Sequence, residues 1–179
     1  INNVVEPVFK NNNDSIYYID LSKMNYNLGG SALAQTLGYI GNQSSDIKDS
    51  KYFKKAFEVF QNLIKKDLIS SGHDISSGGL ITSLLEMCFS GTNIGAKIDV
   101  SILKENDIIK LFFNENIGLI FQGEKEIENV FKSESIEFYK IGEVNSSGIL
   151  EILKNNNSYE FGISKYRDIW YKSSYLLDI

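Results

Sequence analysis

The chain has 179 residues, of which 42% are hydrophobic and 23% are charged, as is usual for a folded soluble domain. A chain of this length buries roughly 70% of its unfolded surface, so it needs no disulfide or structural metal to fold. Its single Cys excludes an internal disulfide, and one Cys with one His excludes a Cys/His zinc site. The net charge of −5, without a basic block, argues against nucleic-acid binding.

The sequence also indicates where the protein works. No apolar stretch approaches the roughly 18 residues that a membrane-spanning helix needs. The opening residues, INNVVEPVF, lack the charged start and apolar run of a secretory signal. We therefore predict a cytoplasmic protein that binds neither membrane nor nucleic acid. Because the chain opens on Ile1 and closes directly after a helical pattern, we expect residues 1–179 to be one domain excised from a larger enzyme.

Hydrophobic periodicity and turn residues divide the chain into strands and helices. In chain order, the pattern predicts a strand at 15–21, helices at 32–40 and 49–66, a strand at 68–73, a helix at 80–90, a strand at 96–100, a helix at 106–113, a strand at 117–121, a helix at 124–133, strands at 138–144, 148–153 and 159–163, and a closing helix at 165–177. Helices interleaved with strands, with a late run of strands, favour an α/β or α+β fold.

Two of these helices carry apolar residues at helical spacing. In the helix at 49–66 they form an aromatic stripe that recurs every three or four residues: Phe53, Phe57, Phe60 and Ile64. We interpret this stripe as core-facing rather than as a ligand box. In the closing helix, the residues expected on one side are Ile169, Trp170, Ser173 and Leu177.

The helix at 80–90, LITSLLEMCFS, is apolar nearly all round and is expected to be buried on most sides. Its single charge, Glu86, must then be paired, lie near an edge or be functional, and we favour a structural role. Cys88 lies in the same helix with no base near it in the sequence. We predict a buried, inert thiol.

The stretch SSGHDISSGG at 70–79 carries the chemistry, because it follows a predicted strand and opens the buried helix. The first turn of a helix has backbone N–H groups without partners and about half a positive charge from the helix dipole, so it suits an anion. Gly78 and Gly79 lack the Cβ atoms that would hold a phosphate away from the backbone. Asp74 would repel a bare phosphate, but a Mg²⁺ ion between them resolves the conflict. We therefore predict Asp74 as a magnesium ligand and Ser76 as a nucleotide contact.

The same residues also have a purely structural interpretation. Asp and Ser before a helix are ordinary caps, and a lone His such as His73 is more often packed or capping than a base. The chain has neither a Walker A pattern nor a GxSxG nucleophile elbow. A second glycine turn, Gly29-Gly30-Ser31, has the same layout, with Ser31 as the expected helix N-cap. We interpret that turn first as structural, and second as a further phosphate seat.

Two long strings, LGGSALAQTLGYIGNQSSDIKDSKYFKKAFEVFQNLI and ISSGHDISSGGLITSLLEMCFSG, point together to one family. By these strings the chain resembles the phosphoribosylformylglycinamidine synthases, or formylglycinamide ribonucleotide amidotransferases, in their large single-chain form. The resemblance is to the second carboxy-terminal-type domain of this aminoimidazole ribonucleotide synthetase superfamily. It runs from about Ile16 to the closing helix. The HD-S-GG core is shared more loosely with other members, whereas GGSALAQ and the LLEM helix favour the purine enzyme.

The resemblance implies a mixed or antiparallel sheet flanked by helices, within a ligase of purine biosynthesis. Such an enzyme uses ATP, Mg²⁺ and glutamine to convert formylglycinamide ribonucleotide to the amidine. ATP is needed because an amide oxygen is a poor leaving group until it is phosphorylated. The implied partners are the remaining synthetase subdomains and the glutaminase domain of the same chain. Since that separate domain carries the Cys nucleophile, Cys88 is not assigned this role.

By position, Asp74 matches the family's magnesium-binding Asp and Ser76 its nucleotide-contacting Ser, at an ATP or ADP site built mostly by the neighbouring subdomain. Many members have an Asp where this chain has Ser77, which removes one carboxylate from the loop. We expect the isolated domain to be inactive. Two alternatives stay open: a non-catalytic scaffold that holds a nucleotide, and a domain of another ATP-dependent member of the superfamily.

Overall fold

A computed structural model of the protein describes residues 4–91 and 93–175. Its strands are β1 (Ser15–Asp20), β2 (Ile69–Asp74), β3 (Gly95–Asp99), β4 (Gly118–Gly123), β5 (Tyr139–Asn145), β6 (Ile149–Lys154) and β7 (Asn157–Gly162). Its helices are α1 (Ala32–Thr36), α2 (Ser50–Lys65), α3 (Gly79–Cys88), α4 (Ile108–Phe113), α5 (Ile127–Ser133) and α6 (Ile163–Tyr175).

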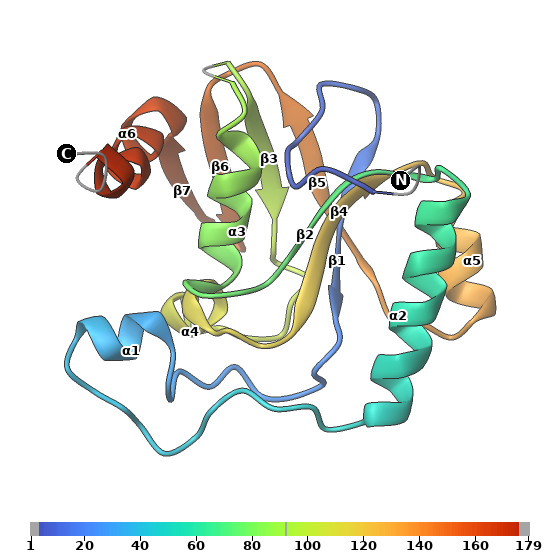
Figure 1. The fold of residues 1–179 in the computed structure, drawn as a ribbon, viewed down its shortest axis with the longest axis horizontal. Coiled ribbons are helices and arrows are strands. Elements are labelled where there is room, and N and C mark those ends of the chain that lie inside the picture. The colour runs from blue at the N-terminus through green and yellow to red at the C-terminus, as the bar shows by residue number, and fades with distance from the viewer. Residues whose placement is uncertain (1–3, 92, 176–179) are drawn as a thin grey trace.

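The seven strands form one sheet in the order β2-β4-β1-β5-β3-β6-β7 (Figure 1). All neighbouring pairs are antiparallel except β3 and β6, which are parallel. The predicted fold, a mixed sheet flanked by helices, is therefore confirmed. Strands β6 and β7 form an antiparallel hairpin in which Lys154 pairs with Asn157.

Helices cover both faces of the sheet where β4 and β1 lie. Ile16 and Tyr18 of β1 pack in the same cluster as α3 and α4, whereas Tyr17 and Ile19 pack in the cluster that contains α2 and α5. All four side chains are buried, since neighbouring residues of a strand point to opposite faces and both faces are covered here. This explains why β1 is an unbroken apolar run rather than an alternating one.

Nearer the β7 edge, one face of the sheet stays open. In β3 and β6 the residues Ala96, Ile98, Leu150 and Ile152 are buried. Between and after them, Lys97 and Asp99 are exposed and Glu151 is half-buried. Lys97 pairs with Glu151 there at 3.5 Å. The strands therefore alternate apolar and polar residues in this half.

Two helix predictions need correction, and a third is only partly covered by the described residues. Helix α1 ends at Thr36 rather than at residue 40, because Gly38 takes a positive φ of 75° and turns the chain. The buried face of α2 is formed by Ala56, Phe60, Leu63 and Ile64, while Phe57 is 44% exposed and stacks on Phe53. In α6, Ile169 is 57% exposed and Trp170 is 48% exposed, whereas the predicted Leu177 lies outside the described residues.

Candidate functional site

The predicted metal ligand stands at the end of an edge strand, where the chain leaves the sheet. Asp74 is the last residue of β2, and its side chain is 72% exposed. The next residue, Ile75, is buried, and its N–H donates to the carbonyl of Gly118 at 2.9 Å. Ser76 is exposed again. Burial of Ile75 thus fixes the loop while Asp74 and Ser76 remain accessible to a ligand.

The backbone carbonyl of Asp74 is held by neighbouring side chains, although the carboxylate is exposed. Its carbonyl oxygen accepts a hydrogen bond from the Ser83 hydroxyl of α3 at 3.0 Å, and the Nδ1 atom of His73 lies 2.7 Å from it. Ser83 is buried. The exposed carboxylate is therefore carried on a backbone that is tied to the following helix.

The two glycines that open α3 have a packing reason to be glycine. Gly78 and Gly79 have φ values of 88° and 73°, in the left-handed region that disfavours other residues. A Cβ atom on Gly78 would lie 2.3 Å from Oγ1 of Thr82, and one on Gly79 would lie 2.5 Å from the carbonyl oxygen of Phe112. The start of α3 thus packs directly against the end of α4. The predicted contact of Gly78 and Gly79 with a phosphate stays a prediction.

Sequence reasoning missed Glu115, which joins the two glycine turns. Its Oε1 atom accepts hydrogen bonds from the backbone N–H of Gly78 and from that of Ala32, both at 2.8 Å. Glu115 is half-buried in the short connection between α4 and β4. A signal was present in the sequence, because Asn114-Glu115-Asn116 is a polar group between two apolar elements.

The second glycine turn is shaped as predicted at its helix end. Ser31 is the N-cap of α1, where its Oγ atom accepts from the N–H of Ala34 at 3.2 Å and donates to the carbonyl of Leu28 at 2.7 Å. Gly30 has a φ of 75°, and nothing lies within 4 Å of a Cβ atom built on it. The first amide of α1, on Ala32, is bound by Glu115. The turn is thus satisfied within the protein.

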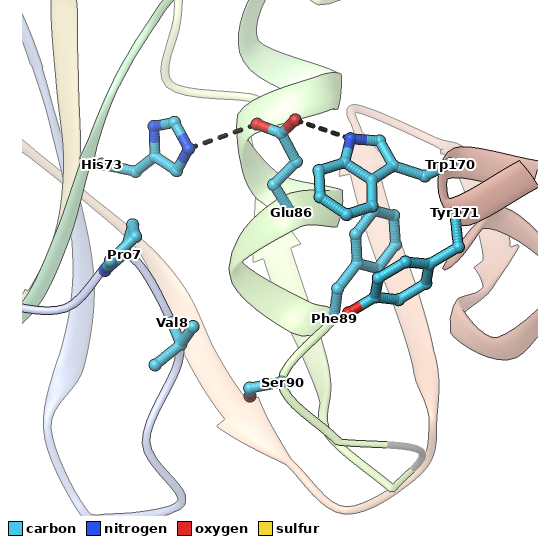
Figure 2. A pocket seen from close by; sticks show the side chains of 8 residues that line it. All are labelled: Pro7, Val8, His73, Glu86, Phe89, Ser90, Trp170 and Tyr171. Atoms are coloured by element: carbon cyan, nitrogen blue, oxygen red, sulfur yellow. Dashed lines mark hydrogen bonds and ion pairs between the residues drawn. The ribbon is translucent and has the colours of Figure 1, made fainter. Parts of the chain in front are cut away.

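On the other side of His73 lies a half-open pocket of about 340 Å³ between α3, α6 and the N-terminal segment (Figure 2). Glu86 of α3 stands in its wall, with Oε2 3.2 Å from Nε2 of His73 and Oε1 accepting from Nε1 of Trp170 at 3.1 Å. Phe89 packs on Trp170 at a ring distance of 5.8 Å. Glu86 is therefore paired, which was one of the three alternatives stated for it. Its hydrogen bond to Trp170 also links α3 to α6.

Cys88 is fully buried in α3, as predicted. Burial raises the pKa of its thiol to about 12, so the thiolate that would act as a nucleophile is negligible near neutral pH. Cys88 is therefore a core residue.

The described residues form no complete metal site of their own. Nowhere in 4–91 and 93–175 do three or more His, Cys, Asp or Glu side chains gather closely enough to hold a metal ion. Mg²⁺ is usually held by one or two carboxylates together with phosphate oxygens and water, so one exposed Asp fits a site shared with a nucleotide. In the same part of the chain, no helix is long and apolar enough to span a membrane.

This mixed sheet flanked by helices falls in a known domain family. Residues 13–154 match the model of the family "AIR synthase related protein, C-terminal domain", and the chain belongs to this family.

The chain is also similar in sequence to two curated proteins that share one enzyme name. The chain is 34% identical over 188 aligned residues to the probable phosphoribosylformylglycinamidine synthase, chloroplastic/mitochondrial, of Arabidopsis thaliana, across 99% of the chain. It is 32% identical over 171 residues to the phosphoribosylformylglycinamidine synthase of Homo sapiens, across 91% of the chain. In both comparisons the chain spans 13% of the relative's length.

Solved structures share the fold at low identity. PurL of Thermotoga maritima complexed with FGAR matches with a TM-score of 0.71 and 15% identity, over 92% of this chain and 29% of that one. The same protein complexed with ATP matches with a TM-score of 0.66 and 16% identity, over 90% and 27%. The hydrogenase maturation protein HypE in complex with ATP matches at 0.53 and 16%, over 87% and 51%.

Proposed function

We propose that the chain is a domain of a phosphoribosylformylglycinamidine synthase, the ATP- and glutamine-dependent ligase that converts formylglycinamide ribonucleotide to formylglycinamidine ribonucleotide in purine biosynthesis. The observation that carries this proposal is 34% identity across 99% of the chain to a protein of that name. Solved structures of the same fold were determined with ATP, ADP, AMPPCP and FGAR, which supports a nucleotide-using parent. The proposed location is the cytoplasm, although the Arabidopsis relative is named chloroplastic/mitochondrial.

In this enzyme the domain contributes Asp74 to a Mg²⁺ ion and Ser76 to the nucleotide, with Gly78 and Gly79 shaping the loop between them and α3. The Mg²⁺ ion supplies charge neutralisation at the phosphate oxygens of ATP or ADP. Exposed side chains on a tied backbone support the assignment, since a ligand gains affinity from groups that are already positioned. The remaining nucleotide contacts, the substrate site and glutamine hydrolysis belong to other domains, so the 179-residue chain is inactive alone.

The test is nucleotide retention by the intact enzyme. Asp74→Asn should abolish Mg²⁺-dependent retention of ADP after gel filtration, because the substitution removes the carboxylate charge. Asp168→Asn is the matched control, since Asp168 is 76% exposed on α6, and it should leave retention unchanged. Equal retention by both variants would remove Asp74 from the metal site. Turnover by the 179-residue chain would contradict its proposed dependence on other domains.

One observation favours a scaffold role for this nucleotide. The loop is tied at Ile75, at the Asp74 carbonyl and at Gly78, which suits a site that holds a ligand permanently rather than one that opens at each turnover. If the site is a scaffold, Asp74→Asn should lower the melting temperature of the intact enzyme clearly and its kcat only slightly. A large loss of kcat at unchanged melting temperature would assign the nucleotide to catalysis. Another ATP-dependent member of the superfamily would be favoured instead by a reading frame without a glutaminase domain.

A further inference from the structure

One carboxylate oxygen binds the starts of two helices that are far apart in the sequence. Oε1 of Glu115 accepts from the amide of Gly78, 37 residues away, and from the amide of Ala32, 83 residues away, each at 2.8 Å. Amides at helix starts have no partner within the helix, and a negative charge is favourable there. Hydrogen bonds to a charged acceptor are also stronger than neutral ones.

The segment that presents this carboxylate is itself anchored on both sides. The buried Asn114 donates through Nδ2 to the carbonyls of Lys110 and Leu111 at the end of α4, at 2.8 and 3.2 Å. The buried Asn116 donates through Nδ2 to the carbonyl of Asn25 at 3.1 Å. Glu115 therefore extends from a fixed backbone between two buried amide side chains.

Glu115 and the nearby start of β4 hold the two ends of the loop that follows Asp74, residues 75–78, here called the Asp74 loop. At its first end, the amide of Ile75 donates to the carbonyl of Gly118, where β4 begins. At its second end, the amide of Gly78 donates to Glu115. Ser76 lies between these two bonds and Asp74 directly precedes the first of them. The start of α1 is bound to the same carboxylate.

We propose that Glu115 is a positioning residue, whose carboxylate fixes the Asp74 loop and couples its conformation to the start of α1. The hydrogen-bond bridge forms within this chain and needs no ligand or further domain. Its effect on a nucleotide rests on the proposed function, and the two are tested separately below.

The bridge is tested by amide hydrogen exchange in the 179-residue chain without metal or nucleotide. Glu115→Ala should speed exchange of the Ala32 and Gly78 amides together, by about tenfold or more, because both lose a charge-assisted acceptor. Glu115→Gln keeps an acceptor oxygen and should give intermediate rates at both amides. Glu126→Gln is the control, since Glu126 is exposed at the N-cap of α5 and makes no side-chain cap hydrogen bond.

Coupling is tested by loosening α1 and observing the other turn. Ser31→Ala removes the N-cap of α1 and should speed exchange at Gly78 several-fold in the wild-type background. In the Glu115→Gln background the same substitution should have a much smaller effect at Gly78. Equal effects in the two backgrounds, or faster exchange at only one of the two helix starts in Glu115→Ala, would overturn the proposal. If Glu115→Ala does not fold, the Gln background decides it.

Nucleotide retention then tests what the bridge does in the intact enzyme. Glu115→Gln should weaken Mg²⁺-dependent ADP binding several-fold, while Glu126→Gln should not change it. Exchange results as expected with unchanged ADP binding in Glu115→Gln would overturn the link between the bridge and the metal loop. If Asp74→Asn is also without effect, the proposed function fails as well, although the bridge itself stands.

Discussion

The two glycine turns of this domain look alike in sequence and differ in their surroundings. Gly78-Gly79 opens a ten-residue helix whose residues are mostly buried, and an added Cβ on Gly79 would meet the backbone at the end of α4. Gly29-Gly30 leads into a five-residue helix in which Ala34 alone is buried, and a Cβ on Gly30 would meet nothing within 4 Å. Both turns direct an amide to Glu115. A glycine pair before a helix therefore does not by itself indicate whether the turn is set by packing, by backbone conformation or by a ligand.

The largest expected difference between the turns is the cost of adding one methyl group. Gly79→Ala should lower the free energy of unfolding by about 3 kcal/mol or more, because a positive φ and a collision with fixed backbone act together. Gly30→Ala has a similar φ of 75° but open space, so about 1 kcal/mol is expected. Urea unfolding of the two variants measures both. Equal losses of unfolding free energy would show that the positive φ alone sets the cost at both glycines. The proposed difference in packing between the two turns would then be wrong.

Thiol labelling compares the burial of α3 with the exposure of the segment that follows α1. Cys88 is fully buried and the pKa of its thiol is raised to about 12 by burial. Alkylation at pH 8 should therefore be at least about 100-fold slower in the native chain than in urea, since the helix must first open. A cysteine introduced at Tyr39, which is 72% exposed, gives the matched fast site in a Cys88→Ala background. Comparable native rates at the two positions would contradict the burial of α3.

A coupled pair of substitutions examines the first glycine of α3. Gly78→Ala is expected to be destabilising, in part because the new Cβ would lie 2.3 Å from Oγ1 of Thr82. Thr82→Ala removes Oγ1 and Cγ2 but keeps the Cβ atom, which would lie 2.9 Å from the new one. The obstacle is therefore relieved in part, and the double variant should recover about 1 kcal/mol relative to the sum of the single variants. Denaturant unfolding of all four proteins gives the coupling. Strict additivity would show that Oγ1 and Cγ2 of Thr82 contribute nothing to the cost, which would then lie in the positive φ of Gly78 and the remaining Cβ contact.

The smallest effect is expected on the outer surface next to α1. Ile40 is 79% exposed, so Ile40→Ser should change the free energy of unfolding by less than about 0.5 kcal/mol. Leu84→Ala in α3 is the contrast, with an expected loss of about 3 kcal/mol because Leu84 is fully buried. A loss above about 1 kcal/mol for Ile40→Ser would show that this segment packs against more of the domain than the structure describes.

The sequence predicted well wherever local chemistry decides the structure. The apolar run of β1, the caps at Ser31 and the buried α3 follow from side-chain patterns alone, and the structure contains them. Phe57 was placed in the core because a stripe of three- and four-residue steps has two possible edges, and the sheet packs against the edge centred on Ala56 and Phe60. The strand order and the parallel pairing of β3 with β6 depend on contacts between distant segments, which periodicity does not encode.

The candidate site divides in the same way. Asp74 and Ser76 are predicted from a local pattern, a polar loop between a strand and a buried helix, and the structure leaves both accessible. Their ligands stay a prediction. Glu115 was missed because its partners at Gly78 and Ala32 are distant in the chain and use backbone amides, which carry no residue signature. The available hint in the sequence was the polar group formed by Glu115 with Asn114 and Asn116 between two apolar elements.

The most direct test of the account is the position of the metal in the intact enzyme. In crystals grown with ADP and Mn²⁺ as a substitute for Mg²⁺, the account predicts an anomalous-scattering peak at direct ligand distance, about 2.1 Å, from a carboxylate oxygen of Asp74. The Ser76 hydroxyl should lie within hydrogen-bond distance of a phosphate oxygen. Bound ADP with every Mn²⁺ peak more than about 6 Å from Asp74, beyond reach through a single water, would contradict the central claim.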